Sequence, residues 1–305
     1  LYELPTEPFG GIEQLCWSPD GKYIAYSCRK VTGKKYAFST NTEIYIYNVA
    51  TGETSVIDMK GGYDTDPVWS PDGSRLAWIS MARDGYEADK QRLMVAYADW
   101  SEVSGNEKGM PSFWGITDVT ESFKYNASGP VWSKDSEDIY FAALAEGIQG
   151  IFVAEGPSTE AVEGLRKAAV AKKLAPWKVE RLTADDLWYD FGSPFHVAEA
   201  EDGSKTLYTT WCSRDFPTEL VAVTVSADGR AAAADCKQIT AENEHILSQL
   251  AEHQTEARMV RTVDGKDMLT WVLYPPQFDP EKQYPSILIC LGGPQGTLSQ
   301  GWSYR

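Results

Sequence analysis

Residues 15–26 read LCWSPDGKYIAY and residues 68–79 read VWSPDGSRLAWI, so one Trp-Ser-Pro-Asp-Gly stretch occurs twice between short apolar runs. A third copy at residues 131–141, VWSKDSEDIYF, has lost the Pro and the Gly, and a weaker fourth copy spans residues 196–211. In this stretch Pro presets φ, the Asp side chain can bond nearby backbone, and Gly tolerates positive φ. Each copy therefore predicts a β-hairpin.

Further strand-like runs follow each hairpin. Candidate third strands lie at residues 43–49, 92–97, 151–153 and 220–225, and candidate fourth strands at residues 54–57 and 179–183. Four antiparallel strands in units of roughly 50–65 residues are typical of propeller blades. We expect a mostly β fold in which residues 1–255 form four or more four-stranded blades of an incomplete ring, with blades missing before Leu1.

One helix is expected within the third blade. Between residues 159 and 173, small and apolar side chains recur at helical spacing, and the shared face carries Ala161, Val162, Leu165, Ala168 and Ala169. We expect a helical insertion packed on the rim of the propeller.

Composition excludes several classes of function. The 305 residues carry a formal net charge of -16, and such a field repels phosphate backbones, so we expect no nucleic-acid partner. No apolar run approaches the roughly 18–20 residues of a membrane span. Three histidines, and five cysteines without C-x-x-C spacing, predict no metal site. A disulfide between Cys16 and Cys28 stays open, because both fall on neighbouring candidate strands.

The pattern changes near the C-terminus. Residues 258–274 predict a hairpin around Asp264-Gly265. Residues 286–291, SILICL, form a continuous apolar run, as in a strand buried on both faces of an α/β sheet. Gly292-Gly293-Pro294 follows at once, and adjacent glycines let a backbone approach a ligand closely.

Residues 237–305 resemble the junction between propeller and catalytic domain in the prolyl oligopeptidase family of serine peptidases, in its dipeptidyl-peptidase and acylaminoacyl-peptidase branch. The resemblance is carried by NEHILSQL at 243–250, Asp264-Gly265, LYPPQFDP at 273–280, Tyr284-Pro285 and Gly292-Gly293-Pro294. It implies that residues 256–305 begin an α/β-hydrolase domain, with the catalytic Ser, Asp and His beyond Arg305.

The resemblance also implies the only reacting group expected within this chain. The backbone N–H of Gly293 would donate to the oxyanion, with Gly292 supporting the loop, and no cofactor is implied. The family often has His before these glycines, whereas this chain has Leu291, which puts in doubt a side-chain role there.

Other residues of a catalytic type are rejected. Ser303 in GWSYR lacks the final glycine of a G-x-S-x-G elbow and any preceding buried strand, so we expect an ordinary loop residue. His196, His245 and His253 precede the position where the nucleophile is expected, contrary to the Ser, Asp, His order of these enzymes, so none is expected to be the base.

One propeller loop is a candidate substrate site. Dipeptidyl peptidases of this family bind the substrate's ammonium group with propeller acids, and a carboxylate does this by a charge-assisted hydrogen bond. In the loop at residues 83–92, Glu87 is the first candidate, Asp84 is the second, and Tyr86 would line the pocket. The alternative is a solvated loop with local Asp84–Arg83 or Asp89–Arg92 ion pairs.

Together these observations predict part of a serine exopeptidase that releases dipeptides or similar short units from peptide N-termini, with this chain itself inactive. Peptides are the expected partners, a homodimer stays open, and the family implies a periplasmic or otherwise secreted protein. The alternative is a non-catalytic propeller that binds a partner in the cell envelope, because its repeats would look the same.

Overall fold

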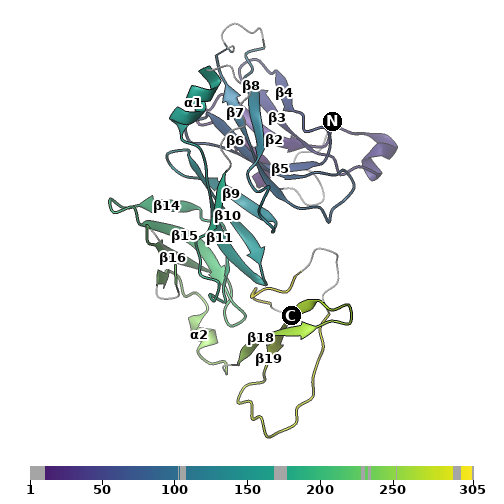
Figure 1. Cartoon of the computed structure of the whole chain (residues 1–305), viewed down its shortest axis with the longest axis vertical. Coiled ribbons are helices and arrows are strands. Elements are labelled where there is room, and N and C mark those ends of the chain that lie inside the picture. The colour runs from purple at the N-terminus through teal and green to yellow at the C-terminus, as the bar shows by residue number, and fades with distance from the viewer. Residues whose placement is uncertain are drawn as a thin grey trace.

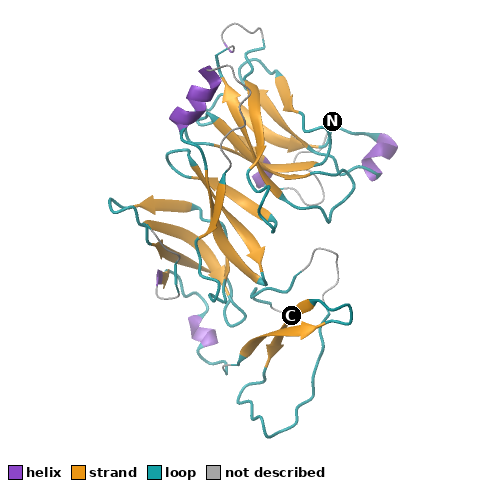
Figure 2. Cartoon of the chain, in the orientation of Figure 1, coloured by secondary structure: helices purple, strands orange, loops and turns teal. Residues whose placement is uncertain are grey.

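Strands dominate the structure, a computed structural model that describes residues 11–101, 103, 108–167, 177–227, 231–232, 235–251, 253–290 and 297–303. Successive sheets follow one another along the molecule, from the N-terminal blades to a separate two-stranded hairpin (Figure 1). The few helices lie at the edges of the sheets (Figure 2).

Four antiparallel sheets form four propeller blades. Each of the first three sheets has four strands in sequence order, and in the fourth sheet two short strands, β13 and β14, both pair with β15. Blade 1 contains β1 (Leu15–Trp17), β2 (Tyr23–Cys28), β3 (Glu43–Asn48) and β4 (Thr54–Ile57); blade 2 contains β5 (Tyr63–Trp69), β6 (Arg75–Met81), β7 (Arg92–Asp99) and β8 (Ser112–Asp118); blade 3 contains β9 (Ala127–Trp132), β10 (Asp138–Ala145), β11 (Ile148–Glu155) and β12 (Lys178–Arg181); and blade 4 contains β13 (Asp190–Phe191), β14 (His196–Glu199), β15 (Lys205–Cys212), β16 (Glu219–Val225) and β17 (Cys236–Gln238). The predicted propeller fold is confirmed.

The repeated turn has the same hydrogen bonds in its first three copies. In blade 1, the Ser18 hydroxyl donates to Asp20 Oδ1 over 2.7 Å and accepts from the Tyr23 N–H over 2.9 Å. These bonds close the hairpin between the first two strands, so the sequence motif acts through its side chains as well as its backbone. The same pair of contacts recurs for Ser70 with Asp72 and Arg75, and for Ser133 with Asp135 and Asp138.

The eroded third copy keeps the turn geometry without its glycine. Gly21 and Gly73 both have a φ of 70°, and Ser136 takes the same left-handed conformation with a φ of 69°. A residue with a Cβ is disfavoured there. The Ser136 hydroxyl accepts a hydrogen bond from the Asp72 N–H of blade 2 over 3.1 Å, which favours this residue at that position.

The hydrophobic cores lie between neighbouring blades. One cluster joins blades 1 and 2 around Trp69 and Trp78, a second joins blades 2 and 3 around Trp132 and Phe141, and a third joins blades 3 and 4 around Trp211. Alternation along each strand gives every inner blade two apolar faces, because both faces meet another blade.

The C-terminal hairpin packs against the propeller. Its strands are β18 (Thr255–Arg261) and β19 (Asp267–Leu273), as the sequence predicts. The Trp271 ring meets Trp188 edge-on at 5.5 Å between centroids. At Gly147, in the turn between β10 and β11, a Cβ would lie 2.5 Å from Leu269 Cδ2, so glycine permits this close approach. The hairpin therefore docks on the blade face that carries the β10–β11 turn.

The expected strand at residues 286–291 is wrong for the part that the structure describes, and the expected helix at residues 159–173 is confirmed for its described part. Residues 286–290 form no strand, and Ile287 and Leu288 are 88% and 83% exposed. A strand buried on both faces needs partner strands and covering layers, and the described residues supply none to this run. The expected helix at 159–173 is observed as α1 (Thr159–Lys167), and residues 168–173 lie outside the described part of the chain.

The remaining helices are short: η1 (Ile12–Gln14), η2 (Gly33–Ala37) and α2 (Glu244–Leu247). Among the described residues, no helix is long and apolar enough to cross a membrane. Cys16 and Cys28 are both free thiols. They are not opposite one another, because Cys16 faces Ala25 across the β1–β2 pair.

Candidate functional site

The loop at residues 82–91, between β6 and β7, emerges on the face of the propeller where the C-terminal hairpin docks. It joins the second and third strands of blade 2, as the turn at residues 146–147 does in blade 3. That blade 3 turn contacts Leu269 and Trp271 of the hairpin. Equivalent connections of successive blades share a face, so the candidate acids lie on the hairpin side.

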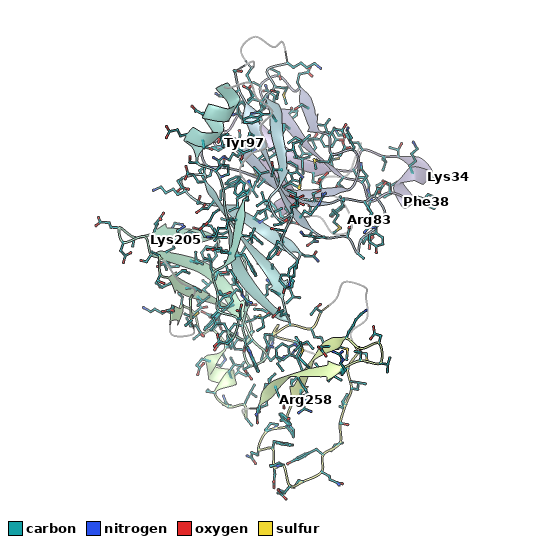
Figure 3. The ribbon with its side chains drawn as sticks, viewed as in Figure 1. Lys34, Phe38, Arg83, Tyr97, Lys205 and Arg258 are labelled. Atoms are coloured by element: carbon teal, nitrogen blue, oxygen red, sulfur yellow. The ribbon has the colours of Figure 1, made fainter. Side chains whose placement is uncertain are left out.

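Asp84 joins this loop to the long loop of blade 1. Its Oδ2 accepts a hydrogen bond from the Ser39 hydroxyl over 2.8 Å, and its Oδ1 accepts from the Thr40 N–H over 2.7 Å. The Thr40 hydroxyl in turn accepts from the Gly85 N–H over 2.9 Å. Figure 3 shows Arg83 near Phe38 of the blade 1 loop, in the same region. Asp84 therefore fixes the two loops to each other.

The ion pair in this loop differs from both pairs considered in the sequence. Arg83 binds Asp89 over 2.9 Å, and its guanidinium lies 3.9 Å from the centroid of the Tyr86 ring. The Arg83 hydrogen bond lowers the pKa of the Asp89 carboxyl below its usual range. Tyr86 is 46% exposed and Glu87 is exposed, so both side chains stay accessible at the loop tip.

A hollow of about 400 Å³ lies between these two loops. Its walls come from both loops and from the turn after β4. They are formed by Val31, Lys35, Phe38, Ser39, Asn41, Gly61 and Asp84. Asp84 thus lines the hollow, and its carboxylate accepts hydrogen bonds from the blade 1 loop. Glu87 lies at the surface in the same loop as Asp84.

The expected oxyanion loop lies outside the described part of the chain. Gly292 and Gly293 lie outside the described residues, as does Leu291. Ser303 is exposed in a stretch, residues 297–303, that has neither helix nor strand, as expected for a loop residue.

The histidines are dispersed. His196 lies on β14 and His245 on α2. His253 Nδ1 lies 3.1 Å from Asp215 Oδ1, which resembles two members of a catalytic triad. Its Nε2 is buried and, within the described residues, has no hydrogen-bond partner. This pair therefore shows no nucleophile in the position that a base would need.

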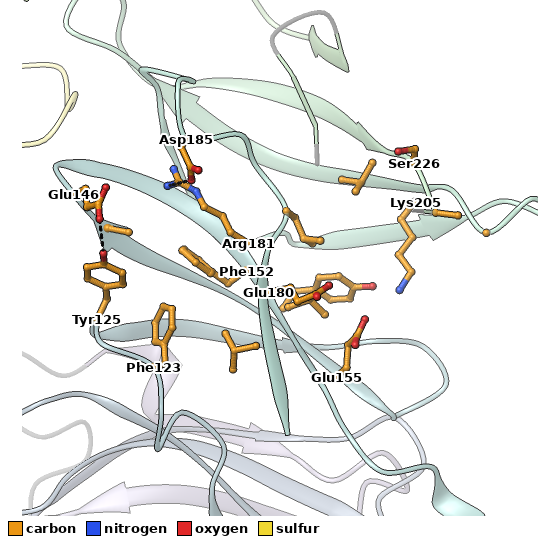
Figure 4. A pocket seen from close by; sticks show the side chains of 18 residues that line it. Phe123, Tyr125, Glu146, Phe152, Glu155, Glu180, Arg181, Asp185, Lys205 and Ser226 are labelled. Carbon is orange, nitrogen blue, oxygen red and sulfur yellow. Dashed lines mark hydrogen bonds and ion pairs between the residues drawn. The ribbon is translucent and has the colours of Figure 1, made fainter. Parts of the chain in front are cut away.

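Sequence reasoning missed a larger cavity, of about 710 Å³, between blades 3 and 4 (Figure 4). It has an aromatic side around Phe123 and Phe152, and charged side chains at its margins. The Tyr125 hydroxyl donates to Glu146 over 3.1 Å, and Arg181 pairs with Asp185 over 2.9 Å. No sequence motif predicts this cavity, because its walls come from strand ends and loops far apart in the chain.

A basic residue spans the interface beside this cavity. Lys205 of blade 4 lies 3.5 Å from the Asp138 carboxylate of blade 3, and its ammonium lies 5.6 Å from the Tyr140 ring centroid. Despite its burial, contacts with Tyr140 and Asp138 raise the pKa of Lys205 to about 12. Burial raises the pKa of Asp138 more than Lys205 lowers it. These contacts join two blades, so we assign them to blade packing.

Curated relatives match the chain along its whole length. It is 39% identical over 306 residues to a protein named dipeptidyl-peptidase 5 from Porphyromonas gingivalis, and the match covers 100% of this chain and 38% of that protein. A dipeptidyl-peptidase 5 from Aspergillus fumigatus is 27% identical over 316 residues, covering 99% of this chain and 38% of its own length. The chain thus spans 38% of the length of these relatives. No family model matches it.

Solved structures share the fold. An acylaminoacyl peptidase from Pyrococcus horikoshii superposes with a TM-score of 0.60 at 14% identity, covering 95% of this chain and 36% of that one. Oligopeptidase B from Trypanosoma brucei gives 0.52 at 12% identity, covering 95% of this chain and 35% of that one. Over its whole length the chain is thus similar in sequence to proteins named dipeptidyl-peptidase 5, as the resemblance at residues 237–305 led us to expect, and its fold is similar to that of an acylaminoacyl peptidase.

Proposed function

We propose that this chain is the propeller-containing part of a serine exopeptidase that releases dipeptides from the N-termini of peptides. The observation that carries the proposal is the match, along the whole chain, to proteins named dipeptidyl-peptidase 5. The Ser, Asp and His of the triad would lie outside these 305 residues. A periplasmic or secreted location is part of the same proposal.

Glu87 is the residue proposed to bind the substrate's free ammonium group. It is exposed at the tip of the loop at residues 82–91, on the face where the hairpin of the second domain docks. Asp84 serves differently, since its carboxylate holds the Ser39 hydroxyl and the Thr40 N–H. We propose that Asp84 positions the loop and that Glu87 provides the negative charge that binds the substrate's ammonium group.

The oxyanion donor stays a proposal based on the family. The N–H of Gly293, shaped by Gly292, would stabilise the negative charge that develops on the carbonyl oxygen of the scissile bond. Removing one such donor costs roughly 3–4 kcal/mol of transition-state stabilisation. In this proposal the nucleophile would lie outside this chain, so we expect the chain to be inactive by itself.

The experiment uses the longer protein that contains this chain. We expect a fluorophosphonate to label it and a dipeptidyl p-nitroanilide with a free amino group to be cleaved faster than its N-acetylated analogue. Glu87→Gln should reduce that preference at least about tenfold, because a charge-assisted hydrogen bond is lost. Glu201→Gln, an exposed acid in the opposite β14–β15 turn, is the matched control.

Three results would each contradict a different part of the proposal. Absence of fluorophosphonate labelling would favour a non-catalytic binding propeller. If Glu87→Gln keeps the preference for the free amine, Glu87 does not bind the ammonium group. That result would not affect the proposed peptidase activity. Turnover by the purified 305-residue chain would contradict its expected inactivity.

A further inference from the structure

The loop at residues 213–218, between β15 and β16 of blade 4, is held rigidly by its own contacts. The Ser213 N–H donates to the Phe216 carbonyl over 3.1 Å, and the Asp215 N–H donates to the Ser213 hydroxyl over 3.0 Å. The Phe216 ring lies 5.3 Å from Trp211 and 6.0 Å from Tyr189. The aromatic cluster makes this loop a firm part of the blade.

Two side chains hold consecutive carbonyls of the C-terminal segment. Arg214 Nη2 of this loop donates to the Ser299 carbonyl over 2.6 Å. Trp271 Nε1 of the C-terminal hairpin donates to the Leu298 carbonyl over 2.9 Å. Gln300, the next residue, is only 2% exposed. Residues 298–300 are thus fixed from the propeller side and from the hairpin side.

Arg214 and Trp271 also contact each other. The Arg214 guanidinium lies 5.6 Å from the Trp271 ring centroid, within the range of a cation–π contact. Trp271 packs edge-on against Trp188 of the propeller. We define the Arg214 clamp as Arg214, Trp271 and the two carbonyls of Leu298 and Ser299.

The same loop holds the start of the hairpin. Asp215 Oδ1 lies 3.1 Å from His253 Nδ1, two residues before β18 begins at Thr255. Adjacent residues of one propeller loop therefore contact the chain where it enters the hairpin and where it returns after residue 297. Such an arrangement fixes the C-terminal part of the chain to blade 4 at two points.

We propose that Arg214 is a positioning residue that sets the place of residues 298–299 relative to the propeller. This proposal rests on the proposed function, because residues 298–299 follow closely the glycines expected to supply the oxyanion donor. In this proposal Arg214 acts through its hydrogen bond to the Ser299 carbonyl and not by contact with the substrate. It acts on the chain that carries the expected donor, and a displacement of about 1 Å in such an element can cost a hundredfold in rate.

The clamp is first tested in the 305-residue chain, without any appeal to activity. We expect Arg214→Met to speed hydrogen exchange in the peptide covering residues 297–303 by at least about tenfold, with exchange in β10 and β11 unchanged. Arg261→Met is the matched control, since Arg261 forms an exposed ion pair with Asp267 at the far end of the hairpin. Unchanged exchange in Arg214→Met would overturn the clamp.

The positioning role is tested by kinetics of the longer protein. We expect Arg214→Met to lower kcat between about tenfold and a hundredfold with KM within about twofold, at temperatures where both proteins are folded. Arg214→Lys should recover part of the loss, because an ammonium can still donate to the Ser299 carbonyl. A raised KM at unchanged kcat, or no rescue by lysine, would overturn this role.

The two tests separate the two proposals. If the longer protein has no peptidase activity, the proposed function fails, and the exchange experiment still decides whether the clamp exists. If exchange rises in Arg214→Met while kcat stays unchanged in an active enzyme, the clamp is real and its role in positioning is overturned.

Discussion

The outer face of blade 1, which carries Trp17, and the interface between blades 2 and 3, which carries Trp132, each contain the Trp of the repeated motif. This Trp is exposed on blade 1 and buried between blades 2 and 3. Trp132 is 7% exposed and its Nε1 donates to the Val68 carbonyl of blade 2 over 3.0 Å. Trp69 is 5% exposed and packs with residues of blade 1. Trp17, in the first copy, is 52% exposed. The motif fixes the turn, whereas the burial of its Trp depends on the blade that precedes it.

The difference extends beyond one side chain. Leu15 and Val56 are 36% and 43% exposed on blade 1. No sheet among the described residues covers this face. In the inner blades, the motif residues Trp69 and Trp132 belong to the hydrophobic clusters between blades.

The largest expected effect comes from removing the two Trp residues separately. Trp132→Ala leaves a cavity between two blades and should lower the free energy of unfolding by about 3–5 kcal/mol. Trp17→Ala removes a half-exposed ring without leaving an enclosed cavity, so we expect a loss of about 1–2 kcal/mol. Urea unfolding of both variants measures the difference. Equal losses would contradict the comparison.

The second prediction concerns a carboxyl group buried between blades 1 and 2. Burial raises the pKa of Asp64 to about 6, although its Oδ1 accepts a hydrogen bond from Trp78 Nε1 over 3.0 Å. Its backbone carbonyl also accepts from the Ser27 hydroxyl of blade 1 over 2.5 Å. The folded state therefore binds the Asp64 proton more tightly than the unfolded state does.

The sign of the pH effect follows from that shift. The stabilising contribution of protonated Asp64 is present below about pH 4 and is lost as the pH rises through about 6, with a total change of at most about 3 kcal/mol. Asp64→Asn keeps an oxygen acceptor for Trp78 and removes the titration. We expect the stability of Asp64→Asn relative to the wild type to increase from pH 4.5 to pH 7.5. A difference that is independent of pH would contradict burial as the cause.

The smallest expected effect compares two copies of the turn. Gly73→Ala places a Cβ at a φ of 70°, where the nearest heavy atom outside the turn is an ordinary 3.7 Å away, so the cost is conformational, about 1–2 kcal/mol. Ser136→Gly relieves similar strain but loses the acceptor of the Asp72 N–H, so the two terms should cancel within about 0.5 kcal/mol. Thermal unfolding measures both. A clear gain in Tm for Ser136→Gly would show that the hydrogen bond between blades contributes little.

The sequence predicted the blades well, because a blade is a local structure. The motif turns of blades 1 to 3 are each closed by a Ser-Asp pair and a residue in the left-handed conformation, and these contacts lie within about five residues of each other. The hairpin at 258–274 was predicted for the same reason, from alternation around Asp264-Gly265. The apolar run at 286–290 was predicted wrongly, since a buried strand depends on partners that local sequence does not specify.

The candidate site could be predicted only in part. The loop with Asp84, Tyr86 and Glu87 was chosen as a candidate from the family resemblance, its charges and its place between two strands, and its role in binding stays a prediction. That Asp84 is engaged by Ser39 and Thr40 could not be foreseen, because those residues lie 45 and 44 positions earlier in the chain. The cavity between blades 3 and 4 had no sequence signal, for the same reason.

The sequence by itself thus determined the unit of the fold: Trp-Ser-Pro-Asp-Gly and its eroded copies encode turns whose hydrogen bonds are short-range. Only the tertiary structure decided which faces are covered. It buries Trp132 and exposes Trp17, buries Asp64 between two blades, and brings Arg214 to the Ser299 carbonyl, 85 residues away. The physical reason is that burial and long-range hydrogen bonds depend on the packing of neighbouring blades, which no single repeat contains.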